Sequence, residues 1–231
     1  MNRTLAVTRL QLRKKLQLFI VPWLVLGSSF IINLLIAFIS PQPDGEGFYT
    51  GGIASIFIYM MIYGIITYVQ TFPFSLGLGI RRSDFYWGTA LSATAVLFMS
   101  SLGLLLLSVI EGIWTNHWGV DLHFFDLPYW SDGPLLNRWW VPFALLLNLF
   151  WLGFMIGGYF KRFGKTGMLA ATLVGIVVGT VGTYVITYNN WWPSIGEWFA
   201  NRTMAEIALW TLPVTFVFAA LTRLFVRRTT V

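Results

Sequence analysis

Both histidines of the chain, His117 and His123, fall in one short segment that also contains Asp121 and Asp126. Imidazole nitrogens and carboxylate oxygens can bind zinc, and the same groups can transfer protons as general acids and bases. Their spacing matches no motif that is known to specify a metal site. We therefore predict no metal site, and keep an enzyme that acts on lipid through Asp121, His123 and Asp126 as an alternative.

A second candidate for chemistry is the run Gly164-Lys165-Thr166, which has the ending of a phosphate-binding P-loop. That motif needs another glycine five positions before its second glycine, so that backbone N–H groups can surround the phosphates. Position 159 is a tyrosine, Tyr159. The chain also contains no cysteine, which excludes thiolate catalysis. We predict that the chain is not itself an enzyme and that it binds no cofactor.

The sequence leaves little room for a soluble catalytic domain. Of its 231 residues, 57% are hydrophobic and only 10% are charged, which is too little polar surface for a soluble globule. A membrane-spanning helix needs about 20 apolar residues. Six segments meet this length: Leu18–Ile39, Gly51–Phe72, Gly88–Ile110, Trp139–Phe160, Met168–Tyr188 and Ala205–Phe225. We predict an all-α membrane protein with six transmembrane helices, in which residues 1–231 form one transmembrane domain.

The charges alternate from one loop to the next. Thirteen of the fifteen basic residues lie in the N-terminal segment, in the loops after spans two and four, and at the C-terminus, whereas only Arg138 and Arg202 lie on the other side. Basic residues near span ends mark the cytoplasmic side. We predict that both termini are cytoplasmic. Because these basic residues stay close to helix ends, the positive net charge does not indicate nucleic-acid binding.

The middles of the six spans contain no Asp, Glu, Lys, Arg or His. Glu111 and Glu206 fall at outer span ends, where we expect water to reach them. An ionisable residue inside a membrane usually marks a functional site, because its burial is costly. The absence of such residues argues against a proton-coupled carrier and against an intramembrane protease.

Residues 1–17 form a basic segment before the first span. Leu5, Leu12 and Leu16 align on one helical face, which Arg9 interrupts. The segment fits an interfacial amphipathic helix, or a solvated basic tail.

Two further patterns each allow a structural and a functional interpretation. Most of the tryptophans lie near the predicted outer interface, as an aromatic belt or as the lining of an exit for an amphipathic substrate; they are Trp114, Trp118, Trp130, Trp139, Trp140, Trp191, Trp192, Trp198 and Trp210. In span five, Ala171, Gly175 and Gly179 recur at every fourth position. Such a face packs closely against another helix, either in the same chain or in a second subunit.

The loop between spans two and three, residues 71–89, is short, basic and aromatic. We expect Pro73 to weaken the end of span two. Gly77 and Gly79 allow a tight bend, and Ser83 with Asp84 suits the first turn of the next helix. The sequence therefore predicts a rigid element between the two spans.

This loop resembles a region of the membrane subunits of ABC-2-type transporters. In that family an apolar stretch, a glycine, basic residues, an acidic residue and aromatics lead into span three, as they do here in Leu76-Gly77-Leu78-Gly79-Ile80-Arg81-Arg82-Ser83-Asp84-Phe85-Tyr86-Trp87. The likeness extends in outline to the six spans and to an outer segment, Asn189–Met204, that could re-enter the membrane surface. The second glycine, Gly79, and the shortness of the outer segment depart from the family pattern.

The resemblance implies roles for three groups of residues. A coupling helix that docks on a separate, cytoplasmic ATPase dimer would comprise Ile80, Arg81, Arg82, Ser83, Asp84, Phe85, Tyr86 and Trp87. The loop Lys161–Gly167, with Lys161, Arg162 and Lys165, would give a second contact. A second six-span subunit, identical or similar, would pack near spans one and five, at Ala171, Gly175 and Gly179. ATP and magnesium would bind to the partner ATPase.

The resemblance thus indicates a multi-pass permease subunit of an ATP-driven exporter in the bacterial cytoplasmic membrane. Its expected substrate is an amphipathic peptide, a lipid-like compound or a drug. The other alternative is a membrane scaffold or sensor that holds partner proteins and transports nothing.

Overall fold

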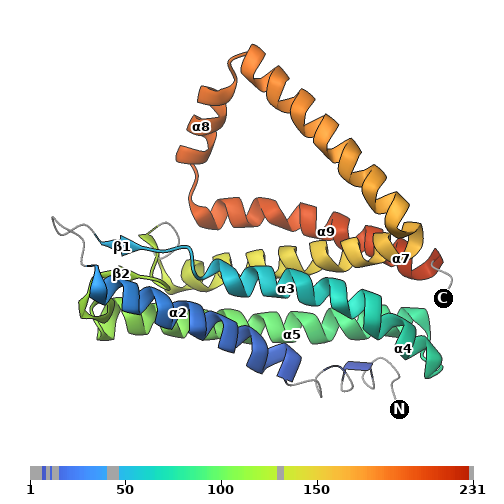
Figure 1. Cartoon of the computed structure of the whole chain (residues 1–231), viewed down its shortest axis with the longest axis horizontal. Coiled ribbons are helices and arrows are strands. Elements are labelled where there is room, and N and C mark those ends of the chain that lie inside the picture. The colour runs from blue at the N-terminus through green and yellow to red at the C-terminus, as the bar shows by residue number, and fades with distance from the viewer. Residues whose placement is uncertain (1–6, 9–10, 12–15, 41–46, 129–132, 229–231) are drawn as a thin grey trace.

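The computed structural model describes residues 7–8, 11, 16–40, 47–128 and 133–228, and these are mostly helical (Figure 1). Within those ranges, five helices are long and apolar enough to cross a membrane: Leu18–Ile39, Ala54–Gly77, Arg82–Trp114, Leu135–Tyr188 and Met204–Arg228. Five of the six predicted spans lie within these helices, and the longest helix contains two of them; the second span, Gly51–Phe72, begins three residues before its helix at Ala54. The prediction of a helical chain with several membrane-length segments is confirmed.

The first long helix begins with a π-helical turn, Leu16–Ile20, and continues as α2, Val21–Ile39. Three described residues before it pack against the start of the third span. Val7 is fully buried, Thr8 donates to the carbonyl of Gly88, and the Gln11 amide donates to Thr89 at 2.6 Å. Residues 1–6, 9–10 and 12–15, which carry the basic residues of the predicted interfacial helix, lie outside the described residues.

The second span does not end at Pro73 as expected. Helix α3, Ala54–Ile66, passes through a π-helical turn, Thr67–Thr71, into α4, Phe72–Gly77. Pro73 is the second residue of α4 and follows directly on the π-helical turn, where the hydrogen-bond pattern has already changed and can accommodate the missing N–H. The wider π turn absorbs the proline, so the helix reaches Gly77 and the connecting turn is shorter than predicted.

That turn leads directly into α5, Arg82–Val109, which a π-helical turn extends to Trp114. Gly79 has a positive φ of 75°, which glycine adopts without strain. The predicted first-turn residues are displaced: the N-cap is Arg81, with extended backbone and no capping side chain, so Ser83 already lies inside the helix. Asp84 remains in the first turn, where its charge complements the helix dipole.

At the opposite end of the bundle, β1, Phe48–Tyr49, pairs in parallel with β2, Leu122–His123. Phe48 is opposite Leu122 and Tyr49 is opposite His123. This pairing connects the segment before α3 to the segment after α5. We call this end the strand end, and the end that contains α4 the basic end (Figure 1).

Spans four and five lie in one helical element, α7, Leu135–Tyr188, which is kinked within the predicted loop Lys161–Gly167, so a kink takes the place of a longer loop. A single residue departs from helical geometry: Gly164, at φ 66° and ψ −165°, a conformation essentially restricted to glycine. The helix bends sharply there, so its first arm packs in the bundle and its second arm diverges from it (Figure 1). One glycine therefore changes the direction of the chain where a loop was predicted.

The chain returns to the bundle through two more helices. Helix α8, Trp192–Ala200, lies at the far end of the second arm, and α9, Met204–Arg228, runs back along the first arm (Figure 1). Ala208, Thr215 and Thr222 are buried, and their seven-residue spacing gives one narrow seam against α7. The predicted outer segment 189–204 is thus formed by α8 and the turns on either side of it.

The closest packing in the bundle joins α3 to the first arm of α7. A Cβ atom added to Gly153 would lie 1.9 Å from the Met61 carbonyl oxygen, and one added to Gly64 would lie 2.4 Å from the Phe150 carbonyl oxygen. A Cβ atom added to Gly157 would lie 2.9 Å from the Ile65 carbonyl oxygen. The two backbones touch because these positions have no side chains, which is the Gly-xxx-Gly mode of packing in membranes.

Candidate functional site

The predicted contact regions gather at the basic end, where α4, the bend of α7 and the last turns of α9 lie together (Figure 1). The basic residues of this end that the structure describes are Arg81, Arg82, Lys161, Arg162, Lys165, Arg223, Arg227 and Arg228. These residues come from three segments that are far apart in the sequence, and the segments meet at this end of the bundle.

The predicted coupling residues divide into an exposed and a buried set. Arg81 and Ser83 are exposed, and Trp87 is 51% exposed. Ile80, Arg82 and Asp84 are partly exposed. Phe85 is fully buried and Tyr86 is 6% exposed. A partner protein can therefore contact this segment only through its exposed side chains.

Phe85 and Tyr86 instead anchor the segment to the bundle. The Phe85 ring contacts Phe72 and Phe154, with centroids 5.1 and 6.3 Å away. Tyr86 packs on Trp151, at 5.7 Å. These ring contacts hold the first turn of α5 against α4 and α7.

Two residues that sequence reasoning did not single out extend the exposed surface. Phe74 and Leu78 are 58% and 57% exposed and flank the turn at Gly79. Together with Arg81, Ser83 and Trp87 they form the surface that we call the tip. Exposed aromatic and apolar side chains with an arginine are typical of protein contact sites. The apolar positions of α4 could have indicated Phe74 and Leu78, but their direction depends on where α4 ends.

The start of α5 is also fixed to the end of α9. Arg82 Nη1 donates to the carbonyl oxygen of Arg227 at 2.8 Å, and the Tyr86 hydroxyl donates to that of Ala219 at 3.0 Å. The Arg223 guanidinium lies 5.5 Å from the Trp87 ring centroid, a cation–π distance. A displacement of the tip therefore acts on both α5 and α9.

The bend of α7 carries the second predicted contact. Lys161, Arg162 and Lys165 are all exposed. The Tyr159 hydroxyl closes the bend by donating to the Gly167 carbonyl at 3.1 Å, and the Arg162 guanidinium lies 5.0 Å from the Phe163 ring centroid. These contacts hold the bend in place. The three exposed basic side chains lie on it, at the same end as the tip.

The small-residue face of span five has no partner among the described residues. Ala171, Gly175 and Gly179 are exposed, and a Cβ atom at either glycine would meet no atom within 4 Å. The interpretation as packing within the chain does not hold for the described residues. The close helix packing that the structure does contain lies in span four, at Gly153 and Gly157, a second Gly-xxx-Gly run that could have been found by the same spacing rule.

At the strand end, the expectation that water reaches Glu111 is wrong, because Glu111 is 0% exposed. Its carboxylate accepts the backbone N–H groups of Phe124, Phe125 and Asp126 at 2.8–3.1 Å. It also accepts the Trp118 indole N–H at 2.8 Å. These N–H groups replace the hydrogen bonds to water that a carboxylate loses when it is buried.

Asp126 connects three elements at this end. Its carboxylate accepts the hydroxyl of Ser108, on α5, at 3.1 Å and lies 3.6 Å from the Arg138 guanidinium, on α7. The same carboxylate lies 3.5 Å from Nε2 of His117. The two histidines and Asp121, for which the sequence predicted no metal site, thus lie together in a loop with well-defined contacts.

The tryptophans of the strand end are mainly exposed. Trp114 is 78% exposed, and Trp191, Trp192, Trp198 and Trp210 are also exposed. Trp118, Trp139 and Trp140 are partly buried, and Trp130 lies outside the described residues. An open pocket of about 780 Å³ lies nearby, between the start of α7 and the α8–α9 connection, lined by Asn137, Val141, Phe199 and Met204 among others.

The arrangement defines a helical protein with several helices suited to a membrane, a basic end and an acidic, aromatic strand end. Protein-family models, curated proteins and solved structures contain no match to the chain.

Proposed function

We propose that the chain is the permease subunit of an ATP-driven exporter of the ABC-2 type, located in the bacterial cytoplasmic membrane with the basic end inward. ATP and magnesium bind to a separate cytoplasmic ATPase dimer, which docks on the tip. The transported molecule is an amphipathic peptide, a lipid-like compound or a drug. A second six-span subunit completes the transporter.

The observation that supports this proposal most is the construction of the tip. Phe74, Leu78 and Trp87 expose apolar surface beside Arg81 at the end of the bundle. The same element is fixed to α9 through Arg82 and Tyr86. A rigid element that presents a contact surface and is tied to two spans can pass a partner's movement into the membrane domain.

The strand end suits the release of an amphipathic molecule. The pocket beside α8 is lined by apolar side chains together with Arg202 and Asn137. Such a mixture of apolar walls and a few polar groups is typical of small-molecule sites. The pocket lies at the opposite end from the tip, as an export path requires.

The test is a pulldown of the full chain from its native membrane in mild detergent, with copurifying proteins identified and ATP hydrolysis measured. We expect an ATPase to copurify in roughly equal amount. Its recovery should fall at least about tenfold in the variant that combines Arg81→Glu with Trp87→Ala, because both side chains are exposed members of the tip.

The matched control is Trp114→Ala, which removes an even more exposed tryptophan at the strand end. This control should leave ATPase recovery unchanged. Equal recovery with the tip variant, or no ATPase from membranes that contain candidate motors, would refute the proposal and favour the scaffold or sensor.

A further inference from the structure

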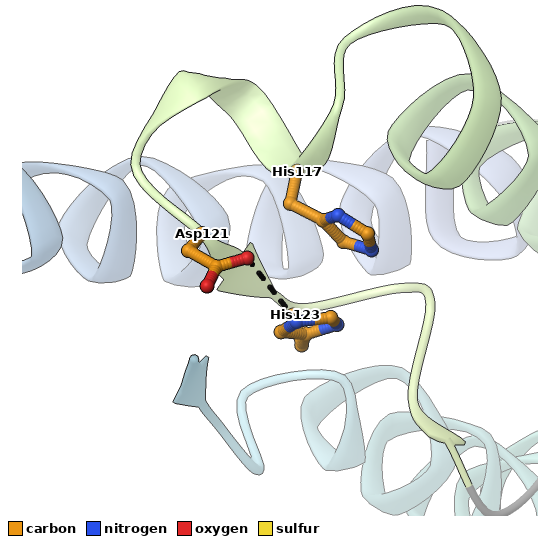
Figure 2. Close-up of side chains that lie close together, drawn as sticks. All are labelled: His117, Asp121 and His123. Carbon is orange, nitrogen blue, oxygen red and sulfur yellow. Dashed lines mark ion pairs between the residues drawn. The ribbon is translucent and has the colours of Figure 1, made fainter. Parts of the chain in front are cut away.

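The two histidines of the chain converge at the strand end, with Asp121 beside them (Figure 2). The ring centroids of His117 and His123 are 4.0 Å apart. One ligand atom from each of His117, Asp121 and His123 lies within 4.8 Å of those of the other two. We propose that these three residues bind a divalent transition metal ion such as zinc.

The hydrogen bond of His123 leaves its other nitrogen free for a metal ion. Nδ1 lies 3.1 Å from the backbone carbonyl oxygen of Asp126. A carbonyl only accepts hydrogen bonds, so Nδ1 carries a proton, and in the neutral ring Nε2 then has the lone pair. Metal-binding histidines characteristically donate their second N–H to a carbonyl or a carboxylate.

The lone pair of Nε2 faces a second acceptor. Oδ1 of Asp121 lies 3.6 Å from Nε2, as the dashed line in Figure 2 marks. Two acceptors at this distance repel each other unless a proton or a cation lies between them. With the second imidazole close by, three ligands converge on that position, which favours a metal ion over a proton.

His117 is held by the same aspartate that orients His123. Its Nε2 lies 3.5 Å from Oδ2 of Asp126. When this carboxylate accepts the N–H of Nε2, Nδ1 has the lone pair that can bind a metal ion. Asp126 therefore supports both imidazoles, one through its carboxylate and one through its backbone.

The ligand atoms, which lie within 4.8 Å of one another, would have to move closer to bind zinc. Four ligands at about 2.0–2.2 Å from a tetrahedral zinc ion lie roughly 3.4 Å from one another. The Asp121–His123 distance of 3.6 Å is already close to this value. Two imidazoles and one carboxylate leave the fourth position for water, and this ligand set suits zinc better than calcium or magnesium, which prefer oxygen ligands.

The backbone around the three residues adopts strained conformations. Asn116, His117, Trp118 and Asp121 have positive φ angles of 45°, 55°, 61° and 54°, which bulky residues rarely adopt. Such conformations persist only where neighbouring contacts impose them, and they concentrate at functional sites. Here the bond from Trp118 to Glu111 is one such contact.

Gly47 leaves the space beside Nε2 open. A Cβ atom at this position would lie 2.9 Å from the Nε2 atom of His123. On the other side the His123 ring stacks on Tyr49, with centroids 4.6 Å apart. A bound ion would therefore lie within the loop after α5, next to the segment before α3 and the β1–β2 pairing.

The experiment measures zinc binding by the full chain in detergent, purified with an affinity tag that has no histidine or cysteine. The chain has two histidines and no cysteine, so no other imidazole or thiol can compete. We expect one zinc ion per chain and a zinc-dependent rise in Tm. Cobalt in place of zinc should give the intense visible absorption of a four-coordinate ion.

Two variants remove ligands without disturbing the loop. Asp121→Asn keeps a residue that tolerates positive φ at a side chain that is 58% exposed. His123→Asn keeps a donor for the Asp126 carbonyl but lacks Nε2. Each should weaken zinc binding at least about tenfold, since even the loss of a supporting group costs 10–100-fold. The control Glu197→Gln, at an exposed acid on α8, should bind like the unchanged chain.

The proposal fails if the unchanged chain binds zinc no more tightly than the variant that combines His117→Ala with His123→Asn. It fails equally if cobalt shows only the weak absorption of the hydrated ion. Either result would leave the cluster as a set of ion pairs that need protonated histidines. The outcome of the ATPase pulldown has no bearing on this test, because the tip lies at the other end of the bundle.

Discussion

The Glu111 carboxylate and the Trp118 indole N–H meet at 2.8 Å in the buried part of the strand end. Three consecutive backbone N–H groups, of Phe124, Phe125 and Asp126, reach the same carboxylate. The residue that seemed from the sequence to be a solvated acid at a helix end is therefore the centre around which the loop after α5 is folded. A single buried carboxylate organises a segment that has almost no regular secondary structure.

Replacing Glu111 with glutamine should destabilise this loop strongly. The amide offers one acceptor oxygen, and its NH₂ group would face backbone N–H donors, so buried donors would lose their partner. Hydrogen bonds to a charged group contribute about 1.5–3 kcal/mol each, and an unsatisfied buried donor costs about 1–3 kcal/mol. We expect a loss of roughly 3–5 kcal/mol in the free energy of unfolding and faster hydrogen exchange at residues 124–126.

The control for this change is Glu206→Gln. Glu206 forms an exposed i,i+4 pair with Arg202 at 3.5 Å, and both side chains are 45% exposed. Such pairs contribute about 0–1 kcal/mol. A Glu111→Gln chain with the same unfolding free energy as the Glu206→Gln chain would show that the carboxylate does not organise the loop.

The two Gly-xxx-Gly runs should respond differently to alanine. Gly153→Ala places a methyl group against the Met61 backbone, and overpacking of this kind costs about 1–3 kcal/mol. Gly175→Ala meets no atom within 4 Å, so the stability of the isolated subunit should not fall. Thermal unfolding in detergent compares the two. Equal stability of both variants would contradict the close α3–α7 packing.

The exposed face of span five should lie at a contact between two copies of the chain. Because the chain has no cysteine, a single Gly175→Cys substitution can report this contact by disulfide cross-linking in membranes. We expect a covalent dimer for Gly175→Cys and none for Val177→Cys, which lies on the opposite side of the same helix. Equal cross-linking at both positions would rule out a specific seam.

Gly164 should be irreplaceable by a residue with a side chain. Its φ of 66° with ψ of −165° is a combination that costs other residues about 1–3 kcal/mol. Gly164→Ala should therefore change the angle between the two arms of α7. Spin labels on cysteines at Leu136 and Tyr188, which are both exposed, measure this change as a distance.

Gly182→Ala provides the control for the bend. Gly182 lies within the second arm without a positive φ, and a Cβ atom there would meet nothing within 4 Å. The distance between the labels should stay the same in this variant. An unchanged distance in Gly164→Ala would mean that the bend does not depend on glycine geometry.

Local hydropathy predicted the helices well, because each long apolar run must become a helix in a membrane. It could not place their ends. Pro73 fits inside a helix because a π turn precedes it. Gly164 takes the place of a loop because its dihedral angles alone change the direction of the chain. Both outcomes depend on dihedral angles that the sequence does not display.

The candidate sites were predicted only in part, for the same kind of reason. The coupling residues lie at the basic end, but the burial of Phe85 and Tyr86 depends on α7 and α9, which are distant in the sequence. The donors for Glu111 come from residues 13 to 15 positions later. His117 and His123 meet because the loop between them turns through positive φ angles, and no spacing rule describes that path.

The pairing of β1 with β2 also bears on how the chain is inserted into a membrane. In the proposed orientation, with the basic end inward, Phe48 and Tyr49 would cross the bilayer before Leu122 and His123 are synthesised, so they would stay unpaired until α5 is inserted. The strand pair can close only if both connections have reached the same side. A chain in which one helical hairpin is inserted upside down cannot form it, and such a chain also lacks the contacts that hold His123 beside Tyr49. The β1–β2 pair can therefore form in correctly inserted molecules and not in inverted ones.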